Sequence, residues 1–142
     1  MPSVYNKMGI QFSYPENWTL DEEDALEEST SVSVYSPGGA FWTIILHPLS
    51  TDPHKLARAA MQAVQKEYED FEAEPVSETI ADKEVSGFDM NFYCLDLTNT
   101  AQVRAFRNDV ASCVVLCQAE DREFEAMEPV FRAITTSLVR ET

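Results

Sequence analysis

Apolar and polar side chains alternate through most of the chain, which is the period of β-strands that bury one face. The first alternating run covers residues 10–14, and a short apolar piece follows at 18–20. Alternation returns at residues 32–35, and residues 36–39 supply the turn chemistry for a hairpin into residues 41–47. Because both the odd and the even positions of this second arm are apolar, we expect a central strand covered by helices on both faces of the sheet.

Two segments change to helical periodicity. The first opens with Asp52 and Pro53, a favourable N-cap followed by proline at the first helical position. Its apolar residues then recur every three or four positions, at Leu56, Ala60, Val64, Tyr68 and Phe71. The second segment, residues 121–138, contains Pro129, which either kinks the helix or begins its main body. Its apolar stripe is Phe124, Met127, Phe131, Ile134 and Leu138.

Between these helices the alternation predicts strands that are joined by short turns. The predicted strands cover residues 76–80, 85–97, 103–107 and 110–119, with turns at 82–83, 98–100 and 108–109. Short connections between successive strands predict an antiparallel meander. The order strands, helix, strands, helix therefore predicts one α+β domain over residues 1–142, a three-layer α/β/α sandwich with a mostly antiparallel sheet.

The charge balance disfavours two classes of partner. The 142-residue chain has 25 Asp and Glu against 10 Lys and Arg, a formal net charge of -15 at pH 7. We expect neither a nucleic-acid nor a membrane partner, because polyanions and anionic lipids would be repelled. The acidic run at residues 21–28 predicts a solvated surface loop. The chain shows no signal-peptide pattern and no apolar stretch of membrane-spanning length, so we expect a cytoplasmic protein.

The three cysteines, Cys94, Cys113 and Cys117, fit a reducing compartment and predict small buried hydrophobes. Cys113 and Cys117 share one face of a predicted strand at roughly 13 Å, too far for a disulfide or a shared metal. A catalytic thiol needs a histidine within hydrogen-bond reach, and the candidates His47 and His54 end a core strand and begin a helix. We therefore expect no enzyme, and a small cysteine-dependent enzyme is the less favoured alternative.

Cofactor and metal chemistry lack a matching pattern. His47, His54 and Asp52 have no established ligand spacing, and residues 22–24 lack the glycine and alternating ligands of a calcium loop. The glycines at 38–39 form a turn rather than a phosphate cradle, because no helix start follows them. We expect neither a cofactor nor a metal.

Large aromatic side chains also occupy strand faces opposite the most evident core positions: Trp18, Tyr35, Trp42, Tyr93 and Phe106. These residues form either a second core layer or, if one helix leaves part of a sheet face open, a groove for an apolar partner or a second subunit. The candidate binding residues are Tyr35, Trp42, Tyr93 and Phe106.

Three local features resemble a known family: FSYPENW at residues 12–18, the hairpin at 36–39, and a final helix that ends EPVFRAITTSL at 128–138. Together they are similar to the PsbP-like fold family, whose members include the extrinsic photosystem II protein, a Ran-binding nuclear import factor and many uncharacterised bacterial proteins. The resemblance implies an α/β/α sandwich that binds proteins, in a bacterial cytosolic member. Some bacterial relatives resemble chaperones that cradle hydrophobic helices of type VI secretion effectors, usually as dimers.

We therefore predict a non-catalytic protein-binding or adaptor module that forms a homodimer through an exposed sheet face or edge. A chaperone-like binder of hydrophobic helices and a structural subunit of a larger assembly are the alternatives. These predictions depend on one inference, that two amphipathic helices cover the sheet and leave no polar cleft.

Overall fold

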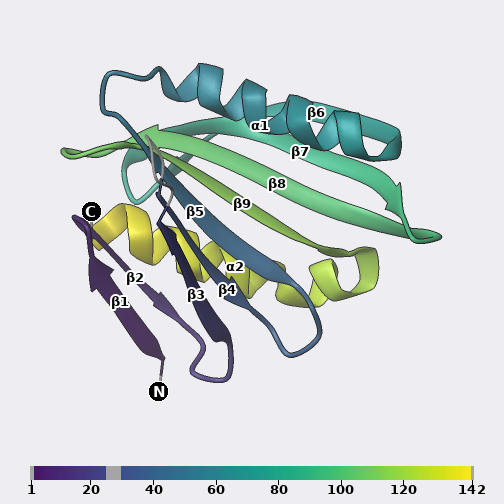
Figure 1. The fold of residues 1–142 in the computed structure, drawn as a ribbon, viewed down its shortest axis with the longest axis horizontal. Coiled ribbons are helices and arrows are strands. Elements are labelled where there is room, and N and C mark those ends of the chain that lie inside the picture. Colours follow the sequence, from purple (N-terminus) through teal and green to yellow (C-terminus); the bar gives the residue numbers. More distant parts are fainter. Residues whose placement is uncertain (1, 25–29, 142) are drawn as a thin grey trace.

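A computed structural model describes residues 2–24 and 30–141, and Figure 1 shows their arrangement. Seven strands form one sheet in the order β3-β4-β5-β9-β8-β7-β6, and β1 and β2 form a separate two-stranded hairpin. Neighbouring strands in both sheets are antiparallel. The predicted α+β fold with an antiparallel sheet is therefore confirmed.

The elements have the following bounds. The strands are β1 (Ser3–Lys7), β2 (Ile10–Tyr14), β3 (Thr19–Asp24), β4 (Thr30–Tyr35), β5 (Phe41–His47), β6 (Glu69–Ile80), β7 (Lys83–Cys94), β8 (Leu97–Arg107) and β9 (Ser112–Glu120). The helices are α1 (Pro53–Glu67) and α2 (Asp121–Glu141).

The two helices lie on opposite faces of the sheet (Figure 1), and α2 contacts β6, β8 and β9 together with β2 of the separate hairpin. Helix α1 packs on β6 to β9, and the core beneath it includes Met90, Phe92 and Val103. Helix α2 and the β1–β2 hairpin together bury the second core, which includes Phe12, Trp42 and Phe131. Each helix therefore covers only part of its face of the sheet. Strand β5 is an interior strand, as predicted. Helix α1 does not extend over β5, although the sequence predicted a helix on both faces of this strand.

Helix α1 is shorter than its apolar stripe predicted. The Asp52 side chain caps its first turn by accepting a hydrogen bond from the His54 backbone N–H at 3.0 Å. The helix ends at Glu67, and Tyr68 is already extended, so the prediction that the stripe continues as helix to Phe71 is wrong. Both aromatic residues nevertheless pack on the α1 core, because an extended chain can turn the same side chains toward it.

Three tight hairpins have turn residues that sequence patterns rarely mark. The turns Met8–Gly9, Ala81–Asp82 and Leu95–Asp96 each place both residues in the left-handed region, with φ between 48° and 78°. This geometry matches the right-handed twist of the flanking strands and normally selects Asn or Gly. The turn predicted at residues 82–83 lies one residue earlier, at Ala81–Asp82, and the turn predicted at residues 98–100 is wrong, because those residues belong to β8.

Both edges of the large sheet have acidic sequences. Residues 21–24, predicted to lie in a loop, belong to the edge strand β3, and residues 25–28 of the same run lie outside the described residues. The opposite edge strand, β6, contains five acidic residues and Pro75. Charge and proline on edge strands hinder pairing with another sheet, so much of the acidity lies where it discourages aggregation.

Strand β1 was not predicted, because it offers only Tyr5 to the core. No helix in residues 2–24 and 30–141 is long and apolar enough to cross a membrane.

Candidate functional site

A buried arginine lies on the sheet face that α2 covers. Arg104 is on β8 between Val103 and Ala105, which face α1, and its side chain is only 9% exposed. Its register partner on β7 is Gly87, where an added Cβ would overlap the Val103 carbonyl oxygen. Glycine at this position therefore permits the close approach of two strand backbones beside the arginine.

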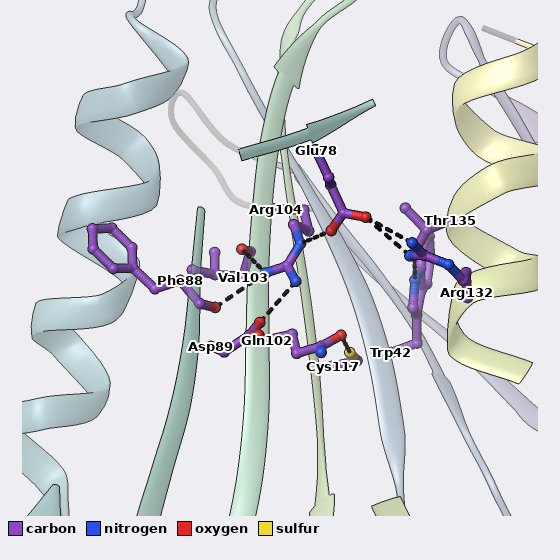
Figure 2. Close-up of polar contacts among 10 residues, drawn as sticks. All are labelled: Trp42, Glu78, Phe88, Asp89, Gln102, Val103, Arg104, Cys117, Arg132 and Thr135. Atoms are coloured by element: carbon purple, nitrogen blue, oxygen red, sulfur yellow. Dashed lines mark hydrogen bonds and ion pairs between the residues drawn. The ribbon is translucent and has the colours of Figure 1, made fainter. Parts of the chain in front are cut away.

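Four charged side chains form one network around Arg104 (Figure 2). Its Nε donates to Glu78 Oε2 at 2.6 Å, and its Nη2 donates to Asp89 Oδ1 at 2.7 Å. From α2, Arg132 Nη1 and Nη2 donate to Glu78 Oε1 at 3.0 and 2.8 Å. The remaining guanidinium nitrogen of Arg104 donates to the carbonyl oxygens of Phe88 at 3.2 Å and Val103 at 3.0 Å. Two cations therefore balance two carboxylates.

The network keeps its members charged. Burial raises the pKa of Glu78, but hydrogen bonds from Arg104 and Arg132 outweigh it and hold that pKa below its ordinary value. Burial lowers the pKa of Arg104, whereas hydrogen bonds to Asp89 and Glu78 raise it above its ordinary value. Glu78 and Arg104 are thus both ionised at neutral pH.

A cavity of about 260 Å³ opens beside this network, between the sheet and α2. Its lining is both polar and apolar: Glu78, Ile80, Gln102, Arg104, Val115, Cys117, Glu128, Phe131, Arg132 and Thr135. The expectation that the helices leave no polar cleft is therefore wrong. Because Arg104 and Glu78 already have partners for their charges, the network is suited to holding α2 against β6 rather than to binding a charged ligand.

Sequence reasoning missed this site, although one signal was present. An arginine in the middle of an apolar alternating run, as in residues 103–107, must either reach water or be paired. The alternation places Arg104 and Gln102 on one face of β8, but their partner Glu78 lies two strands away in the sheet. Sequence spacing does not reveal that neighbour.

The cysteines occupy both faces of the sheet. Cys113 and Cys117 are buried on the α2 face, as their predicted shared face required, and Cys94 packs with the core under α1. Burial raises the pKa of Cys113 and of Cys117 to about 12, so these two thiols stay protonated at neutral pH. All three cysteines are free thiols, and Cys94 lies on the opposite face of the sheet from Cys113 and Cys117, so it cannot form a disulfide with either of them.

The histidines have partners other than thiols. His54 Nδ1 lies 2.9 Å from the Ser86 hydroxyl, and burial lowers the pKa of His47. Neither ring forms a hydrogen bond with a cysteine within the described ranges. Asp52 serves as the cap of α1. Across the same residues, no group of three or more His, Cys, Asp or Glu side chains is arranged to hold a metal ion.

The candidate binding aromatics separate into buried and exposed residues. Trp18, Trp42 and Phe106 are buried in the α2-side core, where the Trp42 indole N–H donates to Thr135 Oγ1 at 2.9 Å. These three residues belong to a core layer and do not line a surface groove. Tyr35 and Tyr93 are 40% and 47% exposed. The strand registers place these two tyrosines on opposite faces of the sheet, so the structure does not bring the predicted set together.

Tyr35 belongs to a part of the sheet that neither described helix covers. We call this surface the open quarter: it is the α1-side face of β4 and β5, formed by Ser31, Ser33, Tyr35, Phe41, Thr43 and Ile45. The Tyr35 and Phe41 rings lie 6.2 Å apart, and Ile45 is half-buried at the margin of α1. The six residues are uncharged, Tyr35 is the most exposed of them, and Thr43 is only 8% exposed. Aromatic side chains such as Tyr35 are enriched in protein interfaces.

Comparisons with known proteins agree with this fold. The sequence matches no protein-family model and no curated protein. The structure is similar to the solution structure of cyanobacterial PsbP (CyanoP) from Synechocystis sp. PCC 6803, with a TM-score of 0.67 and 11% identity over 96% of this chain and 90% of that one. It is also similar to a protein of unknown function from Pseudomonas aeruginosa, with a TM-score of 0.57 and 11% identity over 96% and 95% of the two chains. The chain therefore has the PsbP-like fold that its sequence resembled.

Proposed function

We propose that this chain is a non-catalytic protein-binding module that docks its partner on the open quarter. The observation that carries the proposal is that neither described helix covers the open quarter, on which Tyr35 is 40% exposed beside Phe41. A tyrosine offers a large rigid contact area at a small entropic cost, and its hydroxyl can pair with a polar partner. A partner on this surface would complete the layer that α1 begins.

The chemistry of the reactive residues supports a binding role over an enzymatic one. A thiol nucleophile must ionise, and the raised pKa of Cys113 and Cys117 opposes ionisation. Three free thiols fit the reducing cytoplasm that the proposal includes. The acidic edges β3 and β6 favour a protein partner over nucleic acid, because a polyanion would meet negative charge at either side of the sheet.

A homodimer is the simplest form of this proposal, and it would use the face rather than the edges. Two copies that met edge to edge would oppose the acidic strands β3 or β6 with their own charge. The six residues of the open quarter carry no charge, and the nearest carboxylate on the same face is at its margin, where Asp21 of β3 pairs with Ser33. Two copies that meet there therefore oppose fewer like charges than an edge-to-edge pair does.

In the chaperone-like alternative, the partner is an apolar helix of another protein. Such a helix would lie on the open quarter beside α1, as a further member of the same layer. Trp42→Ala is an unsuitable test of this alternative, because Trp42 belongs to the α2-side core and its truncation would destabilise the fold. Tyr35 is the informative position.

The test is site-specific photo-cross-linking in the native host, with a photoreactive phenylalanine analogue in place of Tyr35. We expect one discrete cross-linked protein, identified by mass spectrometry, and a second copy of the chain would identify the homodimer. The matched control places the same analogue at Val110, which is exposed in the turn between β8 and β9. Absence of any cross-link from position 35, or the same products from position 110, would contradict the proposal.

A further inference from the structure

We infer that the tip of the β7–β8 hairpin is a second docking site, for a cationic amphipathic segment of a partner protein. We call this surface the acidic tip: it consists of Tyr93, Leu95 and Leu97 together with Glu67, Glu69, Asp70 and Asp96. The inference extends the proposed binding role to a surface four strands across the sheet from Tyr35.

The leucines of the acidic tip are unusually exposed. Leu95 is 91% exposed and lines a groove together with Tyr93. Leu97 is 53% exposed, and its pairing with Cys94 places it on the opposite face of the hairpin from Tyr93. Leu95 also has a φ of 53°, a left-handed conformation that disfavours a side chain with a Cβ and that asparagine or glycine would adopt more easily. The leucine at this position therefore stabilises neither the turn nor the core, whereas it supplies apolar area to a partner.

Negative charge surrounds these apolar side chains. Glu67, Glu69, Asp70 and Asp96 line an open groove with Tyr68, Tyr93, Cys94 and Leu95. None of the four carboxylates has an ion-pair partner in the part of the chain that the structure describes. The groove also adjoins the carboxyl end of α1, where the helix dipole adds partial negative charge, and Lys66 is the basic residue of that last turn.

The exposed apolar side chains and the carboxylates around them together indicate which kind of partner would bind at the acidic tip. Exposed leucines favour an apolar contact, and a rim of unpaired carboxylates favours lysine or arginine beside it. A second copy of the chain is a poor occupant, because it would bring the same carboxylates and a net charge of -15. A partner segment with apolar residues on one face and basic residues around them could contact the leucines and pair with the carboxylates at the same time.

The experiment uses the intact chain and a fluorescently labelled synthetic helix of leucine and lysine, with a helix of leucine and glutamate as the control probe. Binding is measured by fluorescence anisotropy at low and at moderate salt. Leu95→Asn removes the apolar side chain and suits the left-handed turn, so the variant should fold at least as stably as the native chain. We expect its affinity for the leucine–lysine helix to fall about tenfold or more.

A second variant tests the contribution of the carboxylates to binding. Asp70→Asn combined with Asp96→Asn keeps residues that tolerate left-handed φ at both positions and removes two carboxylates. We expect affinity to fall about threefold for each carboxylate removed at low salt, and this difference to shrink as salt rises. Val4→Asn, which alters an exposed apolar side chain on β1, should leave binding unchanged.

Three results would overturn the inference. Leu95→Asn could bind the leucine–lysine helix as tightly as the native chain, or the leucine–glutamate helix could bind equally well. Light scattering could instead reveal a dimer that Leu95→Asn dissolves, which would make a second copy the occupant. None of these results bears on cross-linking from position 35, so this inference and the proposed function fail separately.

Discussion

Carboxylates occur in opposite settings in two regions of the molecule. Around Arg104, whose side chain is 9% exposed, they are paired at 2.6 and 2.7 Å, and the Glu78 side chain is itself only 18% exposed. At the acidic tip they are exposed, and no cation within the described residues pairs with them. The first region consists of Glu78 and Asp89, and the second consists of Glu67, Glu69, Asp70 and Asp96.

The contrast shows how one residue type serves folding in one place and remains available for binding in another. A shielded carboxylate must have a partner, because an unpaired charge away from water costs several kcal/mol. An exposed carboxylate is solvated and contributes little to stability, so its charge remains free to attract a partner. Substitutions should therefore change stability around Arg104 and change binding at the acidic tip.

The largest effect is expected from Arg104→Met. This change keeps much of the side-chain volume but leaves Asp89 unpaired and Glu78 with Arg132 alone. We expect the free energy of unfolding to fall by about 3 kcal/mol, measured by urea denaturation. The matched control is Arg132→Met, because the Arg132 side chain is 61% exposed and its loss should cost less than about 1 kcal/mol. Equal losses for the two variants would contradict the difference in shielding.

A smaller effect concerns the pH dependence of stability through Glu78. The pKa of Glu78 is lowered from 4.5 in the folded chain, so its ionised form stabilises the fold above that value. This contribution is lost as pH falls through the lower folded pKa. We expect the native chain to exceed Glu78→Gln in stability by on the order of 1 kcal/mol at neutral pH, and the difference to close in acid.

The measurement is a series of urea denaturations of both proteins from neutral to acidic pH. Glu72→Gln, on the same strand but exposed, serves as the matched control and should show little difference from the native chain at any pH. A difference between native and Glu78→Gln that persisted unchanged in acid would contradict the assigned pKa direction.

The smallest effect on stability is expected at the acidic tip. Glu67→Gln combined with Glu69→Gln removes two like charges that form no ion pair with any of the residues that the structure describes. We expect the free energy of unfolding to stay within about 0.5 kcal/mol of the native value, or to rise slightly as repulsion falls. Thermal denaturation monitored by circular dichroism would measure the change. A loss as large as that of Arg104→Met would mean that these carboxylates have a structural role.

Local patterns predicted the regular elements better than the points where they end. The strand at residues 41–47 is interior because both of its faces are apolar, and Asp52 with Pro53 marked the start of α1. The end of that helix was missed, because Tyr68 continues the helical stripe and also suits an extended strand. The turn at Leu95–Asp96 was missed for a related reason, since sheet twist imposes left-handed φ there on residues that carry no turn signal.

The candidate sites were less predictable than the fold. Tyr35 was among the predicted binding residues and is exposed, whereas Trp42 and Phe106 belong to the core. Alternation assigns a strand residue to one of two faces, but whether a helix covers that face depends on where the helix docks. Trp42 is buried because the β1–β2 hairpin joins α2 on its face, where the Phe12 ring lies 4.8 Å from the Trp42 ring, whereas neither described helix covers Tyr35.

The sequence by itself determined most of the strands and both helices, the antiparallel sheet and the excess of negative charge, because these follow from residue periodicity and composition. Only the tertiary structure decided that Arg104 meets Glu78 and Asp89, that neither helix covers the open quarter, and that four carboxylates gather around Leu95. These features depend on contacts between residues that are far apart in the chain. Strand order and helix placement decide which of these residues meet, and no local sequence pattern contains that information.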